Sequence, residues 1–129
     1  MINLRKYIKA ITFFCVFSVL ILFSSFFKLY AGEINWLEVA NTNNKIQFID
    51  SQSIKYNSKG YLSVITKLTE RNPANQQILY TDTFLMAVDC ENRLFSKLPI
   101  NSELKQVKDW EIPINDILTK KTIINACSY

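Results

Sequence analysis

The central segment of the chain reads YLSVITKLT at residues 61–69 and ILYTDTFLMAVDC at residues 78–90. Apolar and polar side chains alternate in the first stretch, and one of its faces carries Leu62, Val64, Thr66 and Leu68. The second stretch also alternates, with Asp82 interrupting a face that carries Ile78, Tyr80, Phe84, Met86, Val88 and Cys90. A period of two residues is typical of strands with one buried face. The segment therefore predicts two long antiparallel strands joined by a turn around Asn72 and Pro73.

Shorter elements are predicted on both sides of this pair. Residues 34–39 and 45–50 are apolar stretches that flank the polar residues 41–44, and residues 57–60 form a second turn. Residues 91 and 92 are predicted to close a hairpin into residues 93–97. Near the C-terminus, Pro113 is predicted to open a helix with one stripe formed by Ile117, Ile124 and Cys127. The fold class predicted is α+β, a small antiparallel β-sheet with a short C-terminal helix packed on it.

The first 31 residues have the pattern of an export segment. Arg5, Lys6 and Lys9 precede an apolar run at residues 10–27, and residues 29–31 (LYA) end in a small residue where signal peptidase could cut. Because the run is longer than a usual signal core, both a cleaved signal peptide and an uncleaved signal anchor in contact with the inner membrane remain open. Under either interpretation, residues 32–129 are predicted to form a single domain outside the cytoplasm, in the periplasm, in the cell envelope or secreted.

The net charge of +4 belongs to the export segment. It is carried by Arg5, Lys6, Lys9 and Lys28, so residues 32–129 are formally neutral. Phosphate binding needs a concentrated basic face. We therefore expect no nucleic-acid partner for the exported domain.

Cys90 and Cys127 are the two cysteines of the predicted domain. An even count in an oxidising compartment predicts a disulfide between them, which would stabilise the fold by about 3 to 4 kcal/mol. Two buried free thiols are the alternative. The chain has no histidine, so we expect neither a zinc site nor a histidine-assisted nucleophile, and no cofactor is predicted.

Four residues are candidates for contact with a partner: Trp36, Tyr80, Asp82 and Trp110. The two tryptophans could form an aromatic platform, although tryptophan in a small sheet more often packs against the core. The aspartate lies on the apolar face of its strand, which predicts a pocket, a face open to water, or an ion pair with Lys67 or Arg71.

Asp50 and Asp89 both follow apolar strands. Two carboxylates held close together could support acid–base catalysis. Aspartate at a strand end more often accepts hydrogen bonds from the amides of the following turn, and we expect that role here.

The order of several short motifs resembles one family of bacterial exported domains. The motifs are Trp36-Leu37-Glu38-Val39, Phe48-Ile49-Asp50, Tyr61-Leu62-Ser63-Val64, Met86-Ala87-Val88-Asp89-Cys90, Trp110 near Pro113, and Ala126-Cys127. Together they are similar to the surface-adhesin protein E family, over nearly all of residues 32–129. The resemblance implies a small antiparallel sheet with a helix packed against it, and an adhesin-like role.

Three functional hypotheses follow. The first is an exported, non-catalytic, adhesin-like domain of the bacterial cell envelope that binds a protein partner through a sheet face or an edge strand. The alternative is a periplasmic domain that binds a small ligand, or acts as a scaffold, through the cavity between the sheet and the C-terminal segment. A hydrolase built on Asp50, Asp82 or Asp89 is the third.

Overall fold

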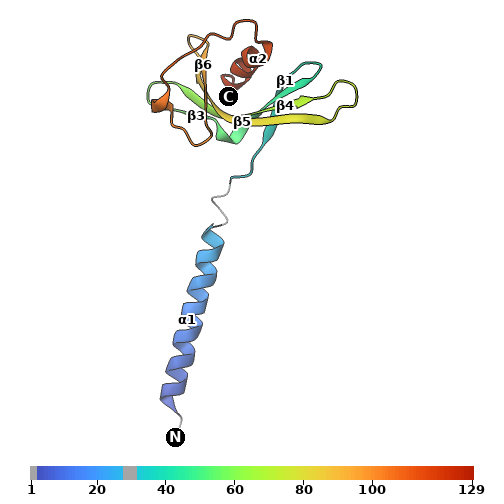
Figure 1. Ribbon diagram of the computed structural model, residues 1–129. Helices are drawn as coiled ribbons and strands as arrows, with labels where there is room; N and C mark the ends of the chain where they lie inside the picture. Colours follow the sequence, from blue (N-terminus) through green and yellow to red (C-terminus); the bar gives the residue numbers. More distant parts are fainter. Residues whose placement is uncertain (1–2, 28–31) are drawn as a thin grey trace. The chain divides into compact units, whose positions relative to one another are not determined.

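The chain divides into two compact units, Met1–Glu33 and Ile34–Tyr129, and the computed structural model describes residues 3–27 and 32–129 of them. The described part of the first unit is the helix α1 (Leu4–Phe27), which contains the apolar run (Figure 1). The predicted cleavage site at residues 29–31 lies outside the described residues, as does Lys28. No helix within the described ranges combines the length and hydropathy needed to cross a bilayer.

The second unit is an open antiparallel sheet with a helix on it (Figure 1). Its strands run in the order β1-β2-β4-β5-β6, and the short β3 pairs with β4. This arrangement confirms the predicted α+β fold. The elements of the unit are β1 (Trp36–Asn41), β2 (Lys45–Asp50), the 3-10 turn η1 (Ser51–Ser53), β3 (Lys55–Tyr56), β4 (Leu62–Arg71), β5 (Ile78–Asp89), β6 (Leu94–Leu98), η2 (Leu104–Gln106) and α2 (Ile117–Ala126).

The core lies between α2 and one face of the sheet. Val64 of β4 is paired with Met86 of β5, and Leu62 is paired with Val88. All four side chains are at most 1 % exposed, and Ile123 of α2 belongs to the same cluster. Since successive strand residues point to opposite faces, this burial confirms the alternation predicted from Leu62 to Thr66. In the second half of β5 the predicted inner face is buried, but residues 84–89 are buried on both faces.

The first half of β5 lies outside this core. Ile78, Leu79 and Tyr80 are 62 %, 62 % and 54 % exposed, so the buried face predicted for all of residues 78–90 begins only at Phe84. The reason is length. A helix of ten residues, such as α2, is about 15 Å long, whereas a strand of twelve residues, such as β5, spans about 40 Å.

The helix α2 begins at Ile117 with Asp116 as its N-cap, not at Pro113. The Asp116 carboxylate accepts hydrogen bonds from the backbone N–H and the hydroxyl of Thr119, as an N-cap residue does. The predicted stripe was also wrong, because Ile117 and Ile124 are both 56 % exposed. The side that faces the sheet instead consists of Leu118, Thr119, Thr122, Ile123 and Ala126.

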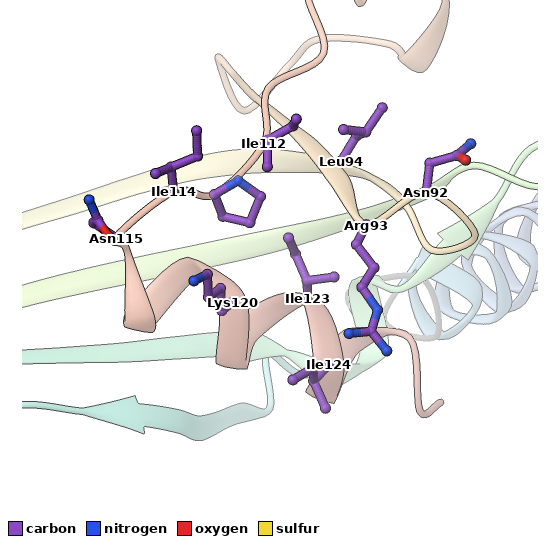
Figure 2. A pocket seen from close by; sticks show the side chains of 10 residues that line it. Asn92, Arg93, Leu94, Ile112, Ile114, Asn115, Lys120, Ile123 and Ile124 are labelled. Atoms are coloured by element: carbon purple, nitrogen blue, oxygen red, sulfur yellow. The ribbon is translucent and has the colours of Figure 1, made fainter.

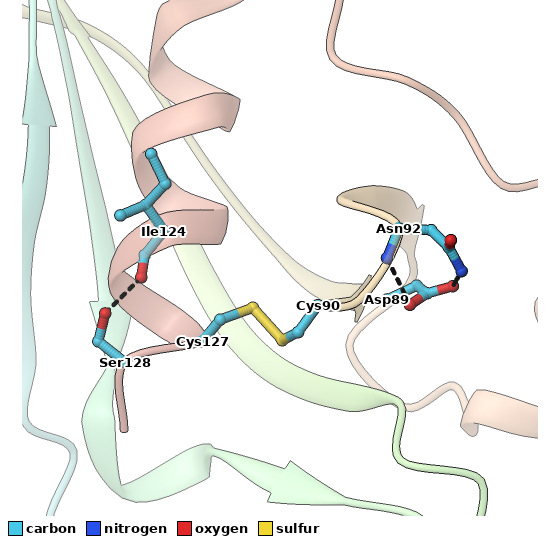
Figure 3. Close-up of a disulfide and its surroundings, with 6 residues drawn as sticks. All are labelled: Asp89, Cys90, Asn92, Ile124, Cys127 and Ser128. Carbon is cyan, nitrogen blue, oxygen red and sulfur yellow. Dashed lines mark hydrogen bonds between the residues drawn. A yellow bond between two sulfur atoms is a disulfide. The ribbon is translucent and has the colours of Figure 1, made fainter.

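A disulfide joins Cys90, directly after β5, to Cys127, the C-cap of α2 (Figure 3). Their Cα atoms are 5.9 Å apart and 37 positions separate them in the sequence. The bond confirms the predicted pairing. It attaches the end of the helix to the turn between β5 and β6, so the last element of the chain is covalently held to the end of β5.

We predict that replacing both cysteines (Cys90→Ala with Cys127→Ala) lowers the free energy of unfolding by about 4 kcal/mol, because the unfolded chain regains the entropy of an open loop. Urea unfolding of the full chain measures this difference. Cys15→Ser, in α1, is the control and should leave the midpoint unchanged. Equal stability of the double variant and the parent protein would contradict the prediction.

Candidate protein-interaction surface

The structure does not bring the four predicted contact residues together. Trp36 begins β1, where the Lys67 ammonium lies 4.4 Å from its ring centroid. Trp110 packs against Tyr61 with ring centroids 4.9 Å apart. Both tryptophans are partly buried, and within the described ranges no ring contact joins them. They do not form the common aromatic platform considered from the sequence.

Asp82 pairs with Lys97 of β6 and not with Lys67 or Arg71. The Lys97 ammonium donates to Oδ2 of Asp82 over 2.5 Å, and the same ammonium lies 4.1 Å from the centroid of the Phe84 ring. The reason is the side-chain direction, because Asp82 and Lys97 both point to the face of the sheet that carries α2, whereas Lys67 points to the opposite face.

Tyr80 and Asp82 lie on a half of β5 that has no strand on its outer side among the described residues. The neighbouring strand β6 pairs only with residues 85–89 of β5. It ends at Leu98, directly before Pro99, which cannot donate to a ladder. Figure 1 shows the hairpin of β4 and β5 projecting beyond β6. Residues 78–83 are therefore an unpaired strand edge, which we call the free edge.

The alternation of backbone hydrogen bonds along β5 identifies the N–H and C=O groups that the free edge leaves unpaired. Phe95 of β6 exchanges both backbone hydrogen bonds with Glu111, so its N–H and C=O point away from β5. Val88 lies opposite Phe95, and opposite residues of an antiparallel pair either bond to each other or both point away from each other. The N–H and C=O of Val88 therefore point to β4. The same alternation along β5 directs the N–H and C=O of Thr81 and Thr83 away from β4, toward solvent.

The opposite edge of the sheet is protected. The register of β1 against β2 shifts between Glu38 and Ala40, which places a bulge at Val39. The side-chain amide of Asn125 in α2 donates to the Val39 carbonyl. Bulges and covering helices are common devices against unwanted strand pairing. From Tyr80 to Thr83 the free edge has neither a bulge nor a covering helix among the described residues. Ile78, Leu79 and Tyr80 add exposed apolar area to this edge.

A groove of about 400 Å³ is a second apolar surface (Figure 2). It lies between α2, the turn after β5 and residues 112–115, and the Cys90–Cys127 bond braces two of its walls. Ile112 and Ile114 beside it are 67 % and 72 % exposed. Arg93 and Lys120 also line it, and neither takes part in an ion pair among the described residues.

The two strand-end aspartates are engaged in turns. The Asp50 carboxylate accepts from the backbone N–H groups of Asn35 and Gln52. The Asp89 carboxylate accepts from both the backbone N–H and the side-chain amide of Asn92 (Figure 3). Each carboxylate therefore has the structural role expected of an aspartate after a strand, and the two bond to different segments of the chain.

The hydrogen bond from the Asn92 side chain is the main cause that lowers the pKa of Asp89 below its usual 3.8; backbone N–H groups of Asn92 and Glu91 act in the same direction and burial opposes them. A folded-state pKa below the unfolded one means that the charged carboxylate stabilises the fold above about pH 4, and that this contribution is lost as the pH falls through the folded pKa.

We therefore predict that Asp89→Asn lowers the melting temperature at pH 7, and that the difference from the parent protein shrinks as the pH falls below about 4. Thermal unfolding across this range measures it. Asp109→Asn, at an exposed position, is the matched control. A difference that stays constant with pH would show that the Asp89 charge does not contribute.

The comparisons with known proteins give one family. The model of the surface adhesin-E family matches residues 37–129, which span the sheet, α2 and both cysteines of the disulfide. No match was found among curated proteins or among solved structures. The family description agrees with a binding role, and together with the disulfide it agrees with a protein outside the cytoplasm. The chain belongs to the surface adhesin-E family.

Proposed function

We propose that the protein is an exported, non-catalytic, adhesin-like domain of the bacterial cell envelope that binds another protein. Its family and its disulfide support this function, because disulfides persist in oxidising compartments. The strand-end carboxylates serve the turns that they cap, and the sequence has no histidine to activate a nucleophile.

The free edge is the observation that carries this proposal. An exposed strand edge accepts an extended segment of a partner as an additional strand, and main-chain hydrogen bonds then supply affinity. Thr81 and Thr83 offer their N–H and C=O groups to such a segment. Ile78, Leu79 and Tyr80 provide exposed apolar side chains beside it. The partner is thus a protein with an accessible extended segment.

Export by the N-terminal segment is part of the proposal. We predict that the domain is recovered from the cell envelope or the medium with Gly32 as its first residue, since cleavage follows small residues. N-terminal sequencing of the recovered protein tests this. A start at Met1 on exported protein would identify an uncleaved anchor in place of a signal peptide, and a full-length chain confined to the cytosol would contradict export.

We predict that Thr83→Pro weakens partner binding by about tenfold or more, because proline removes an edge N–H and obstructs the incoming strand. A photo-reactive residue at Tyr80 first captures and identifies the partner in living cells. Titration of the purified pair then compares the variants. The fold should persist, since proline is tolerated where the strand N–H faces solvent.

Thr83→Val is the matched control, because it keeps the N–H and the β-branched shape and should change affinity by no more than about twofold. Equal affinities of Thr83→Pro and Thr83→Val would contradict strand addition at this edge. Capture from a position outside the free edge, such as Lys59, with none from Tyr80 would contradict it as well.

A further inference from the structure

A cavity of about 300 Å³ lies between the sheet and the N-terminal end of α2. Strands β2, β4, β5 and β6 contribute one side of it, and the first turn of α2 contributes the other. Its volume is at the lower end of the range of ligand pockets. The cavity is separate from the groove of Figure 2, and no residue lines both.

A buried amide lines this cavity. Gln47 of β2 is 3 % exposed, and the hydrogen bonds among the described residues include none to its side chain. The polar atoms of this amide are not fully enclosed. The amide keeps a small contact with solvent through the cavity that it lines. Among the described residues the amide therefore has its hydrogen-bonding groups available to a ligand in the cavity.

The charged groups of the cavity favour an anion at one position. Lys45 lines it beside Gln47, two positions away on the same strand face, and takes part in no ion pair within the described ranges. Lys97 also lines it, but its charge is paired with Asp82. Asp116 is the acidic lining residue, and its oxygens accept from Thr119. Lys45 is thus the lining cation without an ion pair among the described residues, with Glu70 opposite it in the register of β2 and β4.

The rest of the wall is largely apolar. Leu68, Phe84, Met86 and Leu118 line the cavity, and Met86 is 1 % exposed. A wholly ionic ligand would leave this wall without contacts, whereas a short hydrocarbon chain would fill it. The polar and apolar parts together specify a ligand with one anionic end and a short apolar body.

We propose that this cavity binds a carboxylate on a short apolar stem, with the carboxylate between the Lys45 ammonium and the Gln47 amide and the stem against Phe84 and Met86. Both groups donate to a carboxylate, and such charge-assisted hydrogen bonds are stronger than neutral ones. The binding is independent of the free edge. The same chemistry exists in a free short-chain fatty acid and in a glutamate side chain of a polypeptide.

The test is a titration of the isotope-labelled full chain with two probes, butyrate and N-acetylglutamate methylamide, followed by nuclear magnetic resonance. Ligands of this size bind in the millimolar range. We expect saturable shifts of the Gln47 side-chain amide with at least one probe. Saturation with butyrate alone assigns the site to free acids, and saturation with the glutamate derivative alone assigns it to a polypeptide side chain.

Lys45→Met and Gln47→Leu should each weaken the binding by about tenfold or more, from the loss of a hydrogen bond to a charged group. Lys45→Met carries the test if Gln47→Leu perturbs the fold, since Lys45 is only partly buried. Lys55→Met, at an exposed residue outside the cavity, should bind like the parent protein. Absence of saturation with both probes would overturn the proposal, as would equal binding by butyramide or by Lys45→Met.

Discussion

The pairing of β4 with β5 is the constraint on which the domain depends. Its register places Leu62, Val64 and Thr66 opposite Val88, Met86 and Phe84, and all six are buried against α2 or beside it. A slip of one residue would turn each of these side chains to the other face. The same register determines which backbone groups of β5 point away from β4. The composition of the core and the groups exposed at the free edge therefore both follow from the β4–β5 register.

The two halves of β5 differ because their neighbours end at different places. Residues 85–89 have β6 on one side and β4 on the other, with α2 held nearby by the Cys90–Cys127 bond. Within the described part of the chain, residues 78–83 have only β4 as a neighbouring strand, because β6 stops at Leu98 and α2 is short. The stable half supports the exposed half, which is the arrangement that a binding edge requires: backbone groups held in place before the partner arrives.

Much of the fold could be predicted from the sequence because its signals are local. The alternation at residues 61–69 and 84–90 identified the buried face, and the cysteine count, in a chain whose N-terminus predicts export, identified the disulfide. The errors concern contacts between distant segments. The pairing of Asp82 with Lys97 follows only once the β5–β6 register is known. The exposure of Ile78 and Tyr80 depends on where α2 begins and on its length. Pro113 was a misleading local signal, since Asp116 is the residue that caps α2. Gln47 gave no sequence signal at all, because its burial depends on four strands and a helix.

The most direct measurement is amide hydrogen exchange along β5, residue by residue. We expect slow exchange at Asp82 and Phe84, whose N–H groups face β4. Thr81 and Thr83, which lie between and beside them on the same strand, should exchange rapidly because their N–H groups face solvent. Equal protection of all four amides, or slow exchange at Thr81 and Thr83 with rapid exchange at Asp82 and Phe84, would contradict the register and the free edge with it.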